Sequence, residues 1–272
     1  MLTHNAHTGP LRVQKALYPE AQAAHICHAV VVHPPAGVAG GDELAVSIVQ
    51  HAHTHAVLST PGATQWYKTS AQTPATMSVQ LRLAEHAKLD WLPQENILFD
   101  ASHVRLHTEL DLAPSASAIG WDVCVLGRSA KGETWQHASL VQRSRITRGG
   151  QALWIEHSDL NSQHPLCNNT AALANHRIMG TLWAVGGRAN SELAQAVAVD
   201  LPYTAHLKAG VTCLNDTQGG IQQGTQPSGG VMLLRVLGDD MQAVRACLVD
   251  AWTKLRPLIH AADAVPLRLW AM

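Results

Sequence analysis

The sequence has few cysteines, and their spacing excludes the usual cysteine-based sites. Five cysteines are scattered over 272 residues, and none of them forms a Cys-x-x-Cys pair. They are Cys27, Cys124, Cys167, Cys213 and Cys247. An odd number of isolated cysteines argues against a disulfide framework and against a cysteine-based zinc site. We therefore expect most of them to be buried thiols.

An excess of either charge and a long apolar run are also missing. The chain has 19 Lys and Arg against 20 Asp and Glu, so its formal net charge is −1. Without a basic stripe we expect no nucleic-acid partner. No apolar run approaches the roughly 18–20 residues that span a bilayer, so we expect no membrane partner. The segment 1–5 lacks the basic and apolar parts of a signal peptide, which favours a cytoplasmic location.

Familiar catalytic motifs are absent as well. The sequence contains no Gly-x-Ser-x-Gly, no His-Glu-x-x-His and no glycine-rich loop that ends in Gly-Lys-Ser or Gly-Lys-Thr. Nothing in the sequence therefore supports an enzyme. A site assembled from residues far apart in the chain stays open at this level.

Alternating apolar residues predict a mainly β protein. Period-two patterns mark 44–58, 76–83 and 118–126, and further strands are expected at 139–146, 152–156, 179–185, 206–214 and 231–237. Glycine pairs such as Gly186-Gly187 and Gly219-Gly220 separate some of them. Helical spacing predicts a helix over 239–258 that stops at Pro257, and a shorter one over 191–199. No internal repeat is apparent, and these patterns alone leave a sandwich and a β-helix open.

The most informative segment is a constrained loop between two expected strands. It reads His33-Pro34-Pro35-Ala36-Gly37-Val38-Ala39-Gly40-Gly41-Asp42. Proline fixes φ and removes a backbone donor, whereas glycine permits positive φ and close approach of another chain. Such a run is built for one particular bend. It lacks the spacing of a nucleotide-binding turn.

This loop resembles the HPPGGxxGGD signature of the UreD/UreH urease accessory proteins. Three other blocks match the family in the same order: Gly9–Lys15 with Tyr18-Pro19-Glu20, Thr60–Thr64 with Tyr67-Lys68, and Leu89–Phe99. Weaker similarity follows at 120–128 and 268–270. The sequence departs from the family pattern at Ala36, where a glycine is usual, and at Asp90, where Glu is common.

The resemblance implies both a fold and a function. The fold would be a single domain over residues 1–272, with stacked many-stranded, β-helix-like sheets and a C-terminal helical layer. The protein would help to assemble the dinickel site of urease without hydrolysing urea. It would bind apo-urease and form a complex with a UreF-type accessory protein and a UreG-type GTPase. The resemblance implies that the UreF-type protein binds the C-terminal helical side. It would hold no tight cofactor, and Ni²⁺ would pass through its interior transiently.

Four carboxylates are candidates to line such a passage: Asp42, Glu95, Asp122 and Glu156. Asp42 ends the signature loop, so it is our first choice, although it could instead accept bonds from backbone donors in the turn. Asp122 and Glu156 lie inside apolar strands, where a buried carboxylate needs a partner, water or an ion. The alternative for both is a surface-facing side chain. A passage needs sites that attract an ion without holding it.

The chain also has 17 histidines, a count that suggests either metal handling or composition bias. His51, His53 and His55 alternate, so on a single strand their rings would share one face. Three ligands in line on a strand do not converge on one ion, and a solvated polar face is the simpler interpretation. Two other functions remain as alternatives: a His-rich, cupin-like β metalloenzyme and a metal storage module.

Overall fold

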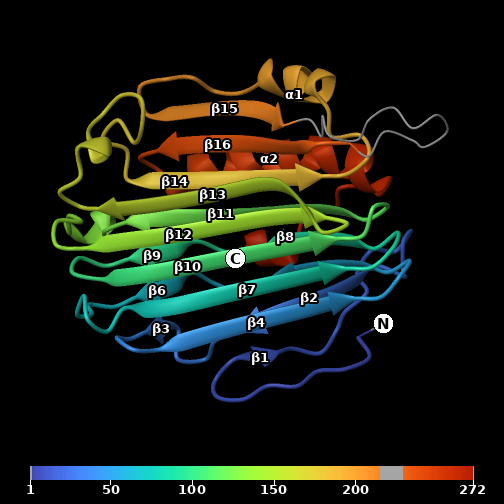
Figure 1. Cartoon of the computed structure of the whole chain (residues 1–272), viewed down its shortest axis with the longest axis horizontal. Coiled ribbons are helices and arrows are strands. Elements are labelled where there is room, and N and C mark those ends of the chain that lie inside the picture. Colours follow the sequence, from blue (N-terminus) through green and yellow to red (C-terminus); the bar gives the residue numbers. More distant parts are fainter. Residues whose placement is uncertain (1, 215–228, 272) are drawn as a thin grey trace.

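The computed structural model describes residues 2–214 and 229–271, so Gly219-Gly220 lies outside the described residues. The chain is mainly β, as predicted, with stacked sheets and a long C-terminal helix. Its strands form an 11-stranded sheet and a 5-stranded sheet, called here the large and small sheets. Figure 1 shows the strands stacked roughly in sequence order, from blue at one end to orange at the other.

Both sheets are assembled from strands of very different length. The main path of the large sheet contains β1 (Arg12–Val13), β2 (Cys27–Val32), β5 (His55–Ser59), β8 (Lys88–Leu92), β11 (Ser117–Leu126), β14 (Ile178–Val185), β16 (Val231–Gly238) and β15 (Leu207–Leu214). Off this path lie the short strands β3 (Gly37–Val38), β6 (Thr64–Trp66) and β9 (Asn96–Leu98). The small sheet contains β13 (Gln151–Asn161), β12 (Ser139–Arg148), β10 (His103–Leu112), β7 (Ala75–Leu83) and β4 (Glu43–Gln50). Three short 3₁₀ turns cover Ser129–Lys131, Pro165–Cys167 and Arg268–Ala271.

The first half of the chain coils between the two sheets. Strands β2, β5, β8 and β11 are parallel neighbours in the large sheet, and they begin at residues 27, 55, 88 and 117. After each of them the chain crosses to the small sheet, where β4, β7, β10 and β12 are also parallel neighbours. This is a β-solenoid-like arrangement. The later strands β13 to β16 extend it with antiparallel pairs.

The structure corrects the interpretation of 44–58 as one strand or hairpin. Strand β4 ends at Gln50 and belongs to the small sheet, whereas β5 starts at His55 and belongs to the large sheet. The segment between them is a turn in which His53 has a φ of 60°. Only β4 alternates between buried and more exposed positions, whereas β5 is buried at four of its five residues, so the apparent alternation across the turn does not reflect one strand face.

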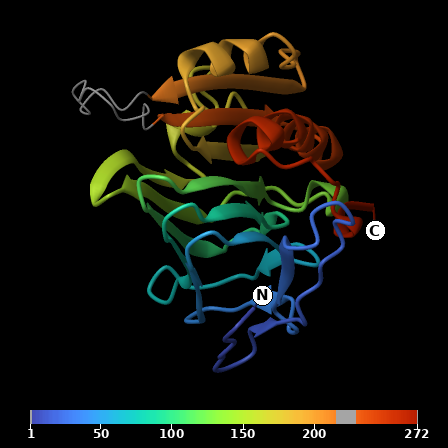
Figure 2. The same ribbon diagram turned by 90° about the vertical axis from the view of Figure 1, so that its right-hand side faces the viewer.

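Two α-helices accompany the sheets. Helix α1 (Ser191–Ala198) packs against β15, and α2 (Met241–His260) packs on the large sheet against β11, β14 and β16. Figure 2 shows α2 on the opposite side of the molecule from the β12–β13 hairpin. The helix begins at Asp240, whose carboxylate accepts a bond from Gln242 N at 3.0 Å. Within the described residues, no helix is long and apolar enough to span a membrane.

Helix α2 does not stop at Pro257, as its sequence suggested, but continues to His260. Proline removes one backbone bond and usually ends or kinks a helix. Here the turn beyond the proline is held by burial, since Leu255, Arg256, Ile259 and His260 all belong to the interior. Tertiary packing therefore overrides the local signal.

Apolar side chains fill both spaces beside the large sheet. One cluster joins the large sheet to α2 and contains Trp121, Leu182 and Trp252. Two others lie between the sheets: one contains Leu110 and Ile146, and the other contains Leu106 and Leu140. The large sheet is thus the middle of three layers.

Candidate functional site

A row of polar side chains separates the two apolar clusters between the sheets. On β10, Leu106 belongs to one cluster and Leu110 to the other, with Thr108 between them. Pairing continues this level across the small sheet from Thr108 to Ser144 and then to Glu156. In the large sheet the matching register runs from Asp122 to Thr181 and then to Arg235. We call these six residues the polar row.

Contacts between the sheets show that the two halves of the polar row face each other. The Thr108 hydroxyl donates a hydrogen bond to Asp122 at one end of the row. At the other end, Arg235 Nη1 donates to Glu156 Oε1 at 2.9 Å and to Thr181 Oγ1 at 2.8 Å. A second Arg235 nitrogen also binds Glu156. Burial dominates at the Asp122 end of the row, where a polar group costs free energy unless it is paired. The side chains of Glu156 and Arg235 at the other end are 31% and 43% exposed, so Glu156 is only partly buried and the row reaches the surface there.

Asp122 is the most perturbed carboxylate of the row. Burial raises its pKa to about 6, and the bond from Thr108 only partly opposes this rise. It lines a small cavity between the sheets, together with Thr60, Thr64, Gln94, Asn96 and Thr108. The sequence left open whether Asp122 has a polar partner or faces the surface, and the structure shows a partner, Thr108. A carboxyl group that titrates near neutral pH can exchange a proton for a cation.

Glu95 lies on the other face of the large sheet, next to α2. Its Oε2 is 2.5 Å from Arg245 Nη2, and the pair adjoins a second small cavity beside Trp121 and Trp270. Pro93 and Gln94 line this cavity as well as the one that contains Asp122. Among the described residues, only Pro93 and Gln94, in the connection from β8 to β9, line both cavities. This connection therefore separates the cavity at Glu95 from the cavity at Asp122.

Asp42 is exposed at the end of the signature loop. Its Oδ2 accepts a bond from Ala39 N at 2.8 Å, which is the turn-holding arrangement that we weighed against a passage role. Elsewhere in the loop, Gly37 lies against the Tyr67 ring, where a Cβ atom would be 2.0 Å from a ring carbon. Gly41 has a φ of +82°. The remaining members of the signature loop, His33, Pro34, Pro35 and Gly40, complete this bend.

The histidine triplet does not share one strand face, so that prediction is wrong. His51 and His53 are exposed in the turn after β4, whereas His55 is buried at the start of β5. The His53 ring stacks on His86 at a centroid distance of 4.8 Å. The three rings diverge because the chain crosses from one sheet to the other between them.

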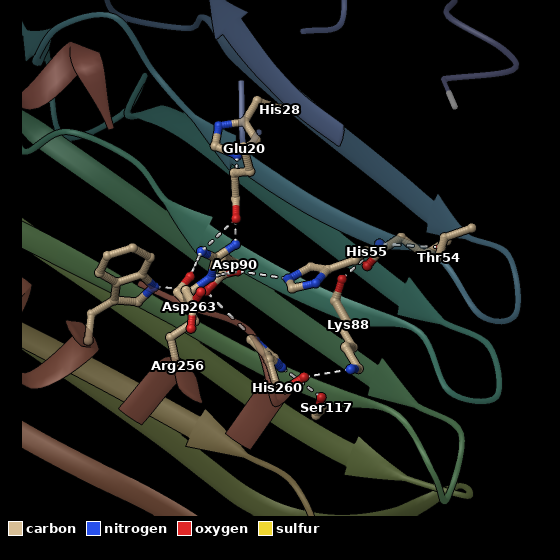
Figure 3. A network of polar contacts seen from close by, with 12 residues as sticks. Glu20, His28, Thr54, His55, Lys88, Asp90, Ser117, Arg256, His260 and Asp263 are labelled. Carbon is tan, nitrogen blue, oxygen red and sulfur yellow. Dashed lines mark hydrogen bonds and ion pairs between the residues drawn. The ribbon is translucent and has the colours of Figure 1, made fainter. Parts of the chain in front are cut away.

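A buried charge network lies under α2, and sequence reasoning missed it (Figure 3). Asp90 of β8 is fully buried, and its Oδ2 accepts bonds from Arg256 Nε and His55 Nε2, both at 3.1 Å. Its Oδ1 accepts a bond from Trp252 Nε1 at 2.8 Å. On the far side of Arg256, Glu20 Oε1 is 2.7 Å from both Arg256 Nη2 and His28 Nε2.

The pKa shifts in this network follow from burial opposed by charge. Burial alone would raise the pKa of Asp90, but His260, His55 and Arg256 hold it far below its usual range. Burial lowers the pKa of His260 to about 4, so its imidazole is neutral at physiological pH. The one signal in the sequence was the departure at Asp90, a charged residue among Leu89, Trp91 and Leu92. Its partners come from segments that no pattern could bring together.

The network also contains a Ser–His–Asp constellation, which calls for a check against catalysis. Ser117 Oγ is 2.8 Å from His260 Nδ1, and His260 Nε2 is 3.7 Å from Asp90 Oδ1. However, Ser117 is 7% exposed, His260 1% and Asp90 0%. A nucleophile needs substrate within reach of its oxygen. This geometry therefore offers no access for one.

Comparisons with known proteins give one consistent answer. The family model described as UreD urease accessory protein matches residues 1–271. A urease accessory protein UreD from Cupriavidus pinatubonensis is 51% identical over 271 residues, covering 100% of this chain and 89% of the relative. The UreD of Cupriavidus necator is 52% identical over 270 residues, covering 99% and 89%. That of Polynucleobacter asymbioticus is 43% identical over 271 residues, covering 100% and 88%. The chain therefore belongs to the UreD family of urease accessory proteins.

Proposed function

We propose that this protein acts in the cytoplasm to deliver nickel to apo-urease, as a scaffold and passage between a UreF- and UreG-type complex and the urease. The observation that carries the proposal is membership of the urease accessory family together with a polar row through the interior. An accessory protein of urease has urease as its target. Family membership also favours this role over the cupin-like metalloenzyme and the storage module.

The proposed passage uses polar groups in order, from the partly exposed end of the polar row inward. It runs from Glu156 and Arg235 along the polar row to Asp122, and then by Gln94 to the cavity beside Glu95. Supporting this order, Asp122 and Glu156 occupy opposite ends of one row, and Gln94 lines both cavities. Single carboxylates placed in series would attract Ni²⁺ and release it again, as conduction requires. Nickel is cargo in this scheme, with no tightly bound cofactor.

Two ion pairs would block the passage, because in each pair an arginine occupies a carboxylate that the ion would have to bind. Arg235 neutralises Glu156, and Arg245 neutralises Glu95. Both arginines come from the late part of the chain, Arg235 from β16 and Arg245 from α2. A partner that binds beside α2 could draw Arg245 away and expose Glu95. This agrees with a UreF-type partner on the helical side.

Asp42 keeps its place as a proposed passage residue, but at the surface. Its exposed carboxylate supports a role at an opening better than one in the interior. Asp42→Ala should slow activation if the residue meets the ion there. If Asp42 only holds the turn, Asp42→Asn should restore the bond to Ala39 N and with it full activation.

The test of the proposal is Asp122→Asn in activation of apo-urease with its UreF- and UreG-type partners. Asp159→Asn, which changes an exposed carboxylate on β13, is the matched control. We expect Asp122→Asn to leave the complex assembled, while nickel content and urea hydrolysis fall severalfold. Normal nickel loading with Asp122→Asn would remove the row from the delivery route. Normal loading without this protein at all would refute the accessory role.

A further inference from the structure

Three potential metal ligands meet between the large sheet and α2, away from the polar row. They are His55 at the start of β5, Asp90 in β8 and His260 at the end of α2. One ligand atom from each lies within 4.8 Å of the others. Their exposed fractions are 5%, 0% and 1%. Figure 3 shows both imidazoles turned toward the Asp90 carboxylate.

The donor spacing fits a single ion after small side-chain rotations. A transition-metal ion sits about 2.0–2.2 Å from imidazole nitrogen and carboxylate oxygen, so donors around it are roughly 3–3.5 Å apart. His55 Nε2 is 3.1 Å from Asp90 Oδ2, and His260 Nε2 is 3.7 Å from Asp90 Oδ1. Two imidazoles and one carboxylate form a donor set that suits zinc and nickel.

His260 carries an unsatisfied atom that points into this group. Its Nε2 is buried without a hydrogen-bond partner among the described residues. Its other nitrogen, Nδ1, is fixed by Ser117 Oγ at 2.8 Å. In either tautomer, Nε2 has no good bond across the 3.7 Å to Asp90. Metal-bound histidines commonly have one nitrogen held by a neighbour while the other binds the ion.

The surrounding charges permit a cation, although they limit its affinity. Asp90 and Glu20 place two negative charges in the buried network, and Arg256 supplies one positive charge between them. Lys88 lies at the rim, where its ammonium contacts the carbonyl oxygen of His260 at 2.5 Å. Arg256 also binds Glu20, so it neutralises the negative charge of Asp90 only in part, and the remaining charge can attract a metal ion. Trp252 donates to the same carboxylate and would stay in place.

We propose that His55, Asp90 and His260 form a buried site for one divalent transition-metal ion, Ni²⁺ or Zn²⁺. Both histidines bind as neutral imidazoles. The ion links the N-terminal coils of the large sheet to the last residue of α2. The site stands independently of the proposed nickel passage, since it shares no residue with the polar row or with the two cavities that line that passage.

The test uses the purified full-length protein and metal alone, without urease. Equilibrium dialysis against Ni²⁺ and optical titration with Co²⁺ are made in a His51→Gln and His53→Gln background, which removes two exposed histidines of the neighbouring turn. We expect binding that saturates at one equivalent and a visible Co²⁺ absorption band. Both should weaken at least tenfold in His260→Gln and in His55→Gln. The matched control, His137→Gln, changes an exposed histidine and should leave both unchanged.

Unaltered affinity and absorption in a folded His260→Gln variant would overturn the site. Circular dichroism decides whether each variant is folded. If the ligand variants do not fold, the background protein itself is decisive: Ni²⁺ must raise its unfolding midpoint and saturate at one equivalent. No rise in the midpoint would refute the proposal even if urease activation depended on the protein.

Discussion

Ala36 holds a backbone conformation that suits glycine better than any L-residue. Its φ is 61°, in the left-handed region, at the position where the family signature usually has glycine. The left-handed conformation costs an L-residue about 1–2 kcal/mol, and glycine loses roughly 0.5–1 kcal/mol of that advantage through its unfolded-state entropy. The sequence identified this departure, and the structure gives it a physical cost.

Ala36→Gly should therefore stabilise the protein by about 0.5–1 kcal/mol. For a chain of this size that corresponds to roughly 1–4 °C in the midpoint of thermal unfolding. The matched control is Ala39→Gly in the same loop, where the backbone is not left-handed, and it should be neutral or destabilising. A lower midpoint for Ala36→Gly would mean that the loop is not strained at this residue.

Asp122 makes the stability of the fold depend on pH in an unusual direction. Its pKa is about 6 in the folded protein and about 3.9 in an unfolded chain. Between these values the folded state binds more protons, so this residue's contribution to stability falls as pH rises from about 4 to 6. Asp122→Asn should remove that slope and raise the free energy of unfolding above pH 7 by on the order of 3 kcal/mol.

Urea unfolding of wild type and Asp122→Asn at several pH values measures this difference. The two proteins should be nearly equal at pH 4 and diverge steadily to pH 7. If the variant is less stable at pH 7, the carboxylate has a charged partner that the row does not reveal. A variant that is more stable yet slower in activation would mark a site kept for function at the expense of stability.

The residues of the charge network explain why sequence reasoning went only part of the way. Helical spacing predicted α2, whereas the segment that forms β8 was noted only as a block that matches the family, with Asp90 as its departure. Neither signal could pair Asp90 with Arg256, which lies 166 residues away. For the histidine triplet, the error came from treating strands of two different sheets as one, although a turn that contains His53 with a φ of 60° separates them. The buried positions of a strand can be predicted from the local sequence. The residues against which they pack depend on the topology of the whole chain.

Helix α2 is anchored to the rest of the molecule by Arg256. This side chain is fully buried and binds Asp90 of the large sheet and Glu20 of the N-terminal segment. It also donates to the carbonyl oxygen of Asp263, beyond the end of the helix. These contacts hold the turn that continues past Pro257. The proline signal alone predicted an earlier end because it carries no information on what the next turn packs against.

Arg256→Met should destabilise the protein by about 3–5 kcal/mol, because it leaves two buried carboxylates without their cation. Lys254→Met on the same helix is the control. Its ion pair with Asp200 is exposed, so its loss should cost less than about 1 kcal/mol. Denaturant unfolding measures both. Equal effects would show that the network is balanced by other charges and that Arg256 is not its central cation.

At the scale of the whole molecule, the coils of the solenoid have the same topology but different residues. Each coil passes from the large sheet to the small one, yet the inward positions are Val79 in one coil and Thr108 or Ser144 in the next ones. No internal repeat is therefore visible in the sequence. Sequence patterns predicted β7, β11, β12 and β14 to β16 and part of β13, but they merged β4 with β5 and missed β8 and β10. The family resemblance, rather than the patterns, chose the stacked β-helix-like architecture that the structure confirms.

The arrangement of the polar row makes a prediction about how its carboxylates combine. If Asp122 and Glu156 lie on one route, an ion meets them in series, and the delays at successive barriers add. Asp122→Asn combined with Glu156→Gln should then slow nickel incorporation by the sum of the two delays. Two residues acting independently on the complex would instead multiply their effects.

Initial rates of nickel incorporation into apo-urease distinguish these outcomes. The rates are compared for the two single variants, the double variant, and Asp122→Asn combined with the exposed change Asp159→Asn. The last pair should equal Asp122→Asn alone. Because Glu156 also holds Arg235, complex assembly is measured for each variant by gel filtration before rates are compared. Multiplied effects in an intact complex would separate the two ends of the row and leave Asp122 alone as a candidate for the route.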